Sequence, residues 1–310
     1  MSTRLAESDW IWKDGDFVRW QDANVHILSL AVQFGASVFE GIRCYETPRG
    51  PAIFRLKEHL RRLFDSCAIY RMRPAHDPES LLDACRGVVK KNGLGSCYIR
   101  PMVLRGYGAA GLNPEGSPVE TYVPAWPWGA YLGGSAQEEG VDVMVSSWSR
   151  SEPNTFPMAA KAGGHYNNAM LIKMEALANG YAEAIALGPG GLVSEGSGQN
   201  LFLVKDGVVI TPVLDGTSLA GITRDAVLKL AKDEGLGVRE QLVPRESLYI
   251  ADELFFTGTA TEVVPIKSVD RIPIGQGRGG PVTLALQKRF RATVSGADGN
   301  ERGWLTYVEA

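Results

Sequence analysis

The sequence is poor in cysteine and histidine, the residues from which disulfides and many metal sites are built. Its four cysteines, Cys44, Cys67, Cys85 and Cys97, are widely spaced and include no C-x-x-C pair. The four histidines, at positions 26, 59, 76 and 165, also lack the spacing of metal ligands. We therefore expect free thiols in a cytoplasmic protein, and no metal site.

An excess of positive charge and a long apolar segment are missing as well. The chain has 32 Lys and Arg residues against 35 Asp and Glu, which argues against a nucleic-acid-binding protein. The longest uncharged stretch, residues 121–137, is interrupted by two prolines and three glycines, so it cannot form a membrane helix. The first sixteen residues contain six charged side chains, and we expect no secretion signal there.

The composition is that of a globular protein with one or two domains. Of the 310 residues, 45% are hydrophobic and 22% are charged, which is typical of a folded soluble chain. The 36 glycines favour a turn-rich α/β or α+β architecture over a helical bundle.

Helices are expected where apolar residues recur at helical spacing, and strands where short apolar runs end in turn residues. The expected helices cover residues 55–67, 79–92, 166–179 and 222–233. The expected strands cover residues 53–54, 96–104, 141–147, 183–187, 192–193, 201–205, 208–211 and 253–257. Asp206-Gly207 lies between two of these strands and predicts a tight β-hairpin.

A segment rich in proline, glycine and aromatic residues, WPWGAYLGGS at 126–135, marks the expected domain boundary. We place a small N-terminal α+β domain at residues 1–127, an interdomain loop at 128–139 and a larger C-terminal domain at 140–310. Solvated linkers are usually polar, so the aromatic residues of this segment favour a loop that packs over another part of the protein.

Lys161 has an unusual setting for a lysine, because small residues surround it in PMAAKAGGHY. Loss of solvent would lower its pKa and favour the neutral amine, which a Schiff-base nucleophile needs. Taken alone, a lysine at such a position is more often a solvated residue on a loop or strand edge.

Several polar residues downstream could act with such a lysine. Tyr166 follows it by five positions at an expected helix start, and Glu195 lies among Gly and Ser in LVSEGSGQNLF. LAGITRDAV at 219–227 places small residues and a threonine at a helix N-terminus, where backbone amides can bind an anion. GTAT at 258–261 adds hydroxyls and amides in a turn. Each feature alone could equally be a helix cap, a turn or core packing.

Five segments in a fixed order carry a family resemblance: FGASVFEGIRCY, KAGGHYNNAML, EGSGQNLFLVKDG, AGITRD and ADELFFTGTATEVVPI. Together they resemble the fold-type IV (class IV) aminotransferases, and more narrowly the branched-chain amino acid aminotransferases. The resemblance runs from about Trp12 to the C-terminus. It implies a small α+β domain, a larger mixed domain with a pseudo-barrel sheet, pyridoxal 5′-phosphate as cofactor, and a homodimer or larger homo-oligomer.

The resemblance also implies a role for each cofactor residue. Lys161 would bind the cofactor as a Schiff base and carry the proton, Glu195 would face the pyridine nitrogen, and Tyr166 would bond the phenolic oxygen. The phosphate would be held by Arg61, Ile222, Thr223 and Thr259, and Leu219 would be a further cofactor-binding residue. Helical phase favours Arg61 over Arg62, because Arg61 flanks the apolar stripe of its expected helix.

The substrate residues implied by the resemblance combine apolar and cationic side chains. They are Phe34, Phe39, Arg43, Tyr98, Arg100, Trp128, Tyr131, Thr259 and Ala260. Core packing is the alternative for Phe39 and Trp128. The family usually has tyrosine where this chain has Phe34, so we expect a weaker hold on the acceptor's γ-carboxylate.

The implied reaction converts L-leucine, L-isoleucine or L-valine and 2-oxoglutarate into the branched 2-oxo acid and L-glutamate, as in branched-chain amino acid biosynthesis. The alternatives within the fold are D-amino acid or (R)-amine transaminases and aminodeoxychorismate lyase. The alternative from another class is a carrier protein that binds pyridoxal phosphate without turning over a substrate. Amino acids and 2-oxo acids are the expected partners, with no nucleic acid and no membrane.

Overall fold

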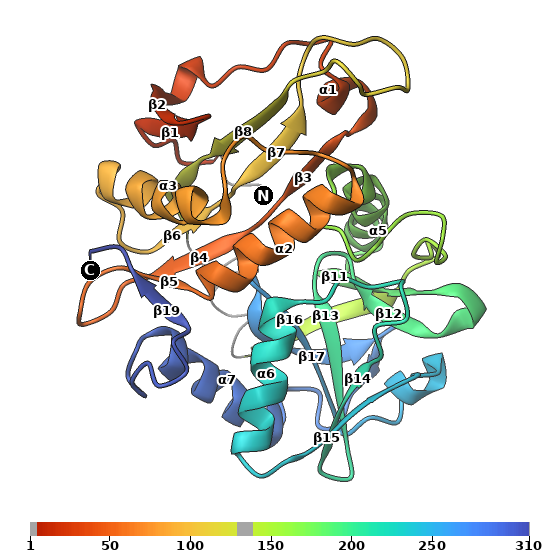
Figure 1. The fold of residues 1–310 in the computed structure, drawn as a ribbon. Helices are drawn as coiled ribbons and strands as arrows, with labels where there is room; N and C mark the ends of the chain where they lie inside the picture. The colour runs from red at the N-terminus through yellow and green to blue at the C-terminus, as the bar shows by residue number, and fades with distance from the viewer. Residues whose placement is uncertain (1–4, 129–138, 310) are drawn as a thin grey trace. The chain divides into compact units, whose positions relative to one another are not determined.

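The chain forms two compact units in a computed structural model that describes residues 5–128 and 139–309 (Figure 1). Within those residues, the first unit contains 5–128, 160–164 and 293–309, and the second contains 139–159 and 165–292. This division differs from the boundaries expected from the sequence, because two later segments belong to the first unit. The segment 160–164, which carries Lys161, is one of them, and the C-terminal segment is the other.

Two five-stranded sheets form the framework of the first unit. One has the strand order β2-β1-β8-β7-β3 and the other β19-β5-β4-β6-β9. The first sheet contains β1 (Trp10–Lys13), β2 (Asp16–Arg19), β3 (Ser37–Phe39), β7 (Met102–Arg105) and β8 (Val119–Val123). The second contains β4 (Ile42–Tyr45), β5 (Ala52–Phe54), β6 (Cys97–Ile99), β9 (Ala125–Pro127) and β19 (Leu305–Tyr307).

The helices of the first unit are short or amphipathic. They are η1 (Trp20–Asp22), α1 (Leu30–Phe34), α2 (Leu56–Ile69) and α3 (Pro78–Lys91). Helix α2 buries Leu56, Leu60, Leu63 and Cys67, which confirms the apolar stripe expected from the sequence. It packs against α3 and β3. All four cysteines are buried and free in this core.

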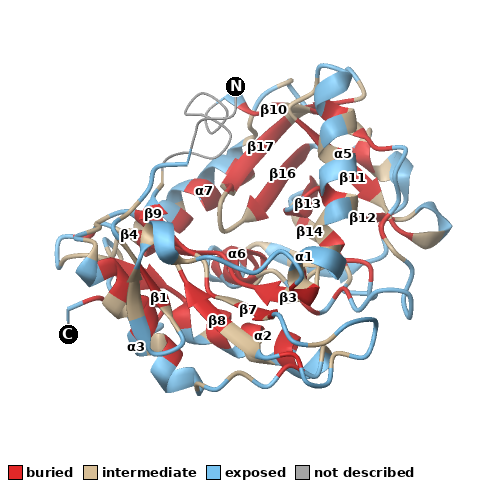
Figure 2. Ribbon diagram, turned by 90° about the horizontal axis from the view of Figure 1, so that it is seen from above, coloured by how far each residue is buried: buried red, intermediate tan, exposed pale blue. Residues whose placement is uncertain are grey.

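The second unit is built around a sheet that closes on itself. Strand β12 pairs with both β11 and β13, so six strands form a ring in the order β12-β11-β10-β17-β16-β13. They are β10 (Val141–Val145), β11 (Glu183–Leu187), β12 (Val193–Gly196), β13 (Asn200–Lys205), β16 (Glu253–Gly258) and β17 (Glu262–Val269). Their buried faces are prominent in Figure 2, and this ring is the pseudo-barrel that the resemblance implies.

The remaining elements of the second unit extend or cover this ring. The added strands are β14 (Val208–Pro212), β15 (Gly237–Gln241) and β18 (Ile272–Pro273). The helices are η2 (Gly163–His165), which starts in the first unit, α5 (Tyr166–Ala178), η3 (Pro189–Gly191), α6 (Ile222–Asp233), η4 (Arg245–Leu248) and α7 (Pro281–Val294). Helix α5 packs against β11, and α6 packs against β15 and β16.

The predicted β-hairpin is present between β13 and β14. Lys205 pairs with Val208 across the turn. Asp206 and Gly207 have φ angles of 51° and 74°, so both central residues adopt the left-handed conformation that a two-residue hairpin loop requires. Among the described residues, no helix is long and apolar enough to cross a membrane.

Candidate active site

Lys161 is held by the first unit on both sides of its backbone. The amide of Phe39 donates to the Lys161 carbonyl (3.0 Å), and the Lys161 amide donates to Ser66 Oγ on α2 (3.0 Å). The small neighbours are required by space, since a Cβ on Gly163 would lie 2.4 Å from Ser37 Oγ. The motif that marks this lysine in the sequence is therefore also what lets its segment lie against β3 and α2.

Four of the predicted residues lie together in the first unit. The Lys161 Nζ is 5.2 Å from the ring centre of Phe39. The Arg100 guanidinium lies 5.0 Å from the same ring and 5.3 Å from the Tyr98 ring. Trp128 extends the group, with its ring centre 4.8 Å from that of Tyr98. The Lys161 amine, the Arg100 guanidinium and the aromatic rings thus form one cluster of neighbouring side chains.

Trp126 belongs to this cluster and was missed in the sequence. Its ring lies 5.7 Å from the Arg100 guanidinium and 5.3 Å from the Tyr98 ring, and it is only 6% exposed. The alternation of WPW, which places Trp126 and Trp128 two residues apart, could have indicated it. Within the described parts of the chain, Arg100 Nε is buried without a hydrogen-bond partner. A guanidinium in this state could bind an anion.

The strand pair β4–β6 positions two more of the predicted substrate residues. Arg43 and Tyr98 lie opposite each other in its register, and Arg43 is buried with its guanidinium 4.9 Å from the ring of Tyr45. The hydroxyl of Tyr98 packs over Gly41, where a Cβ would come within 1.8 Å of it. The glycine of the FEG motif therefore makes room for this tyrosine.

The expected phase of the two arginines on α2 is wrong. Arg61 is exposed, whereas the Arg62 side chain is only 12% exposed and binds the buried Glu40 through Nε (2.6 Å) and Nη2 (2.8 Å). His59 Nδ1 lies 2.7 Å from Glu40 Oε2, the oxygen that also accepts from Arg62 Nη2. Ser66 Oγ, which accepts from Lys161, also donates to the Arg62 carbonyl (2.8 Å). It is Arg62, and not Arg61, that lies on the side of α2 next to the lysine.

The charges of this group are held apart from solvent. Burial raises the pKa of the Glu40 carboxyl, but Arg62 and His59 outweigh that effect and hold its pKa well below the ordinary range. Burial lowers the pKa of His59; Glu40 raises it, and the nearby cations Arg62 and Lys161 lower it again, so the net pKa stays below its ordinary value. The group therefore contains an ionised carboxylate and an uncharged imidazole at neutral pH.

Glu195 lies in strand β12 in the second unit, one residue before the strand ends, and is 5% exposed with several donors around it. Arg150 Nη2 lies 3.2 Å from Oε1. Asn200 Nδ2 and the Leu219 amide each donate to Oε2 at 3.3 Å. Leu219 is one of the predicted cofactor residues, so the structure connects two of them directly.

The predicted anion site of the second unit is a helix N-terminus. Helix α6 begins after Gly221 with no side-chain cap, and Ile222 and Thr223 are buried in its first turn. The backbone dipole of an uncapped helix start favours a negative charge. Gly221 is needed there, since a Cβ would lie 1.9 Å from Asn200 Oδ1.

The other predicted residues are placed less specifically. Thr259 and Ala260 are half-buried in the turn between β16 and β17, and Tyr166 is half-buried at the start of α5. Phe34 ends α1 with 52% of its surface exposed, so it is not buried in a pocket wall in this structure. Tyr131 lies outside the described residues.

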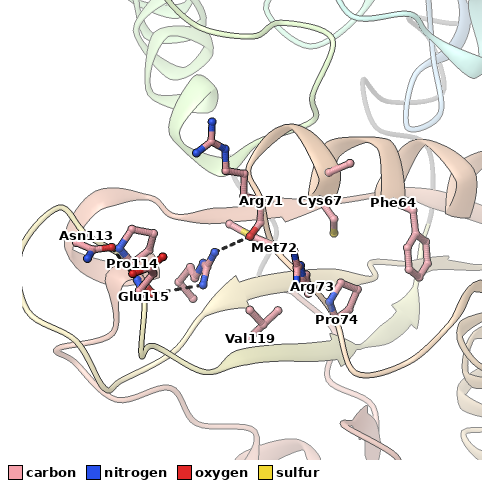
Figure 3. A pocket seen from close by; sticks show the side chains of 12 residues that line it. Phe64, Cys67, Arg71, Met72, Arg73, Pro74, Asn113, Pro114, Glu115 and Val119 are labelled. Atoms are coloured by element: carbon pink, nitrogen blue, oxygen red, sulfur yellow. Dashed lines mark hydrogen bonds between the residues drawn. The ribbon is translucent and has the colours of Figure 1, made fainter.

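A separate cavity of about 850 Å³ lies in the first unit between the end of α2 and the loop at 113–115 (Figure 3). Three arginines line it, and one of them, Arg105, donates to the carbonyls of Arg71 (2.7 Å) and Pro114 (3.3 Å). None of the residues predicted for cofactor or substrate is among the described residues that line it. This cavity is therefore separate from the residues predicted to carry the chemistry.

Comparison with known proteins agrees with the resemblance found in the sequence. Residues 37–269 match the family described as Amino-transferase class IV. The curated branched-chain-amino-acid aminotransferase of Escherichia coli (strain K12) is 51% identical over 309 residues, covering 99% of both chains. That of Pseudomonas aeruginosa is 46% identical over 299 residues, covering 96% of this chain and 97% of the relative.

Solved structures of the same kind superpose closely. A crystal structure of the Escherichia coli branched-chain amino acid aminotransferase has a TM-score of 0.96 at 51% identity, covering 98% of this chain and all of the other. The branched-chain amino acid aminotransferase from Thermobaculum terrenum, in its PLP-form, has a TM-score of 0.90 at 34% identity, covering 98% of this chain and 99% of the other. This chain belongs to the class IV aminotransferase family.

Proposed function

We propose that the protein is a pyridoxal 5′-phosphate-dependent transaminase that moves the amino group of L-leucine, L-isoleucine or L-valine to 2-oxoglutarate. The cluster in which Lys161 lies beside Phe39 and Arg100 carries this proposal. It places an amine, an apolar surface and a fixed cation within one unit. The full-length relatives named as branched-chain aminotransferases support the same substrate class.

The residues present fit the cofactor chemically. Pyridoxal phosphate, when bound, supplies an electron sink for the bonds at the substrate's Cα. Its carbonyl needs an amine, its ring nitrogen a carboxylate and its phosphate a cationic or amide-rich site. The chain offers Lys161, the buried Glu195 and the N-terminus of α6 for these three needs.

Lys161 would hold the cofactor through its amine, and the same amine would carry the proton to and from the substrate's Cα. Its backbone is fixed by Phe39 and Ser66, so the amine moves only through side-chain rotation. Tyr166 would donate to the ring's phenolic oxygen. Glu195 would keep the ring nitrogen protonated, a role for which a buried carboxylate is suited.

Arg62 replaces Arg61 as the arginine that we assign to the phosphate. Support comes from its place on the lysine side of α2, through the shared contact with Ser66. The Ile222–Thr223 helix start, Leu219 and Thr259 complete the set. Glu40 holds the guanidinium in one orientation through two hydrogen bonds, so less conformational freedom is lost when an anion binds.

Arg100 lets one pocket accept two kinds of side chain. Its guanidinium lies over the rings of Phe39, Tyr98 and Trp126, which offer an apolar surface to a branched side chain. The same guanidinium attracts the γ-carboxylate of 2-oxoglutarate or glutamate. Trp128 and Arg43 border this surface, and the amides of Thr259 and Ala260 are assigned to the α-carboxylate. Tyr131 and Phe34 stay as predicted members of the pocket.

A homodimer or larger homo-oligomer is part of the proposal, as is a cytoplasmic location. Helix α5 exposes Met170, Met174 and Leu177 at helical spacing, by 55%, 63% and 58%. Monomeric proteins rarely expose such a continuous apolar stripe. A second copy of this chain is the occupant that we assign to it, because the family resemblance implies a homo-oligomer.

A panel of amino donors tests the reaction. The purified protein is loaded with pyridoxal phosphate and given 2-oxoglutarate with L-leucine, D-leucine or an (R)-arylalkylamine, and glutamate is measured. We expect glutamate from L-leucine at a rate at least tenfold above the other two donors, and none from Lys161→Ala. Turnover of the D-acid or the amine at a higher rate would assign the chain to another transaminase, and no turnover would favour a carrier.

A further inference from the structure

Arg150 is a buried cation that none of the roles above uses. It follows β10, its side chain is only 3% exposed, and its backbone amide donates to the Leu187 carbonyl (2.8 Å). The guanidinium contacts Glu195 Oε1 at 3.2 Å and donates to the carbonyls of Gly196 (2.7 Å) and Ser197 (2.8 Å). It thus binds both the carboxylate and the backbone of the turn that follows it.

The orientation of this guanidinium is fixed from the opposite side. Arg150 Nη1 donates to Asn168 Oδ1 on α5 (3.1 Å), and Asn168 Nδ2 donates in turn to the Ser149 carbonyl (3.0 Å). Arginine carries its donors in a rigid planar fork, so contacts on two edges leave little rotational freedom. The cation beside Glu195 is therefore a fixed part of the second unit.

A second, independent contact holds the far end of the same turn. Gln199 Nε2 donates to Glu183 Oε2 (3.1 Å), and Lys173 Nζ lies 3.0 Å from the same oxygen. Glu183 is fully buried. The turn between β12 and β13 is thus anchored at both ends, but only the Arg150 end brings a positive charge to the Glu195 carboxylate.

The position of the charge decides where a shared proton resides. A proton between a carboxylate and a pyridine nitrogen can sit on either atom. A cation 3.2 Å from the carboxylate favours its ionised form. It would act more strongly on the carboxylate than on a ring bound to that carboxylate, and would therefore favour the proton on the ring nitrogen. Burial makes the effect larger than it would be in water.

We propose that Arg150 is a positioning residue that keeps Glu195 ionised and aimed, so that the pyridine nitrogen of the cofactor carries the proton. This inference rests on the proposed function, in which Glu195 faces that nitrogen. Arg150 itself touches Glu195 and the turn, and acts on the cofactor only through them.

The test is the ¹⁵N chemical shift of the ring nitrogen in the holoenzyme loaded with ring-¹⁵N pyridoxal phosphate. We expect a pyridinium shift in the wild type. Arg150→Gln keeps a donor but removes the charge, and should move the shift toward neutral pyridine and lower kcat by about 10- to 100-fold, the scale known for outer-shell partners at metal sites. Arg150→Lys keeps the charge and should restore most of both.

Two controls separate the possible failures. Lys173→Met removes the cation at the other anchor of the turn, and should lower the thermal midpoint without moving the ¹⁵N shift. Glu195→Gln should move the shift strongly. If Glu195→Gln moves it and folded Arg150→Gln does not, the inference about Arg150 is wrong while the role of Glu195 stands. If neither moves it, the Glu195 assignment in the proposed function is wrong.

A neutral ring nitrogen in the wild type would also overturn the inference, and this result needs no variant to fold. If Arg150→Lys changed the ¹⁵N chemical shift as much as Arg150→Gln does, the charge of Arg150 would not be what matters, and the inference would be wrong. Circular dichroism of each apoprotein identifies variants that have lost the fold.

Discussion

Two adjacent arginines on α2 have different surroundings, although their sequence context is nearly the same. Arg61 is exposed, whereas Arg62 pairs with the buried Glu40. A charge-assisted hydrogen bond contributes roughly 1.5–3 kcal/mol, so loss of the phosphate contact should weaken cofactor binding by about one to two decades. We expect this loss in Arg62→Lys, which keeps a charge for Glu40 but loses the planar fork.

Arg61→Ala is the matched control, one residue away on the same helix. Its dissociation constant for pyridoxal phosphate, measured by equilibrium titration of the apoprotein, should stay close to that of the wild type. A large loss in Arg61→Ala with none in Arg62→Lys would return the assignment to Arg61.

Glu195 is predicted to act through its charge and not its shape. Glu195→Gln keeps the side-chain volume, and its amide oxygen can still accept hydrogen bonds from Asn200 Nδ2 and the Leu219 backbone amide. We expect kcat to fall by roughly 10²-fold or more, the scale of a lost preorganised electrostatic group, while the fold is retained. Steady-state kinetics with L-leucine measure the change, and near-normal turnover would reject this role.

The sequence points to single residues where the local setting is unusual. Lys161 and Glu195 are set among Gly, Ala and Ser, and the close packing around Gly163 and Gly196 leaves no room for larger residues. Arg150 and Trp126 were not found, because their partners are distant in the chain. The Arg150 contact to Glu195 joins residues 45 positions apart, so no local sequence pattern could predict it.

At the scale of secondary structure, α2 combines an apolar stripe with a buried ionic group. The stripe was read correctly from its spacing, and the hairpin at Asp206-Gly207 from its turn residues. The phase of the arginines was not, because the buried face of α2 is wider than its apolar stripe and includes the polar residues His59 and Ser66 on the side of Arg62. Glu40, 22 positions earlier, provides the partner that lets Arg62 lie on the inner side.

Buried His59, on α2, makes the free energy of unfolding of the protein depend on pH. Its pKa is lower in the fold than its ordinary value of 6.5, so the unfolded chain binds the proton more readily. Stability should therefore fall as pH drops through 6.5 toward the folded pKa, by up to about 1.4 kcal/mol per pH unit. Glu40, whose pKa is depressed, adds a further loss only below its ordinary value of 4.5.

His59→Gln removes the titrating group but keeps a donor for Glu40. Thermal unfolding midpoints at pH 7.5 and 5.5 should differ less in His59→Gln than in the wild type. Equal differences in the two proteins would show that another group is responsible.

At the scale of the whole molecule, the two units draw on segments that are far apart in sequence. Strand β19 pairs with β5, so that Leu305 lies opposite Phe54, and the Phe39 amide binds the Lys161 carbonyl. Linear boundaries cannot reveal such pairings, because a short strand carries no signal of its partner. The closed ring of the second unit was available only through the family resemblance.

The apolar stripe of α5 predicts how the molecule assembles. Met174→Glu would place a charge in the middle of the proposed contact and should shift the protein to smaller species in light-scattering chromatography. Leu284→Glu is the matched control, since Leu284 is a single exposed apolar residue on α7, 40% exposed. If Met174→Glu and the wild type have the same molecular mass in this measurement, the interface lies elsewhere.

Borohydride reduction followed by peptide mapping tests the central assignment most directly. Reduction of the holoenzyme should fix the cofactor on Lys161. Prior incubation with L-leucine, without 2-oxoglutarate, should largely prevent this labelling, because transfer of the amino group converts the cofactor to its pyridoxamine form and frees the lysine. Labelling of another lysine, or labelling of Lys161 that L-leucine leaves unchanged, would contradict the account.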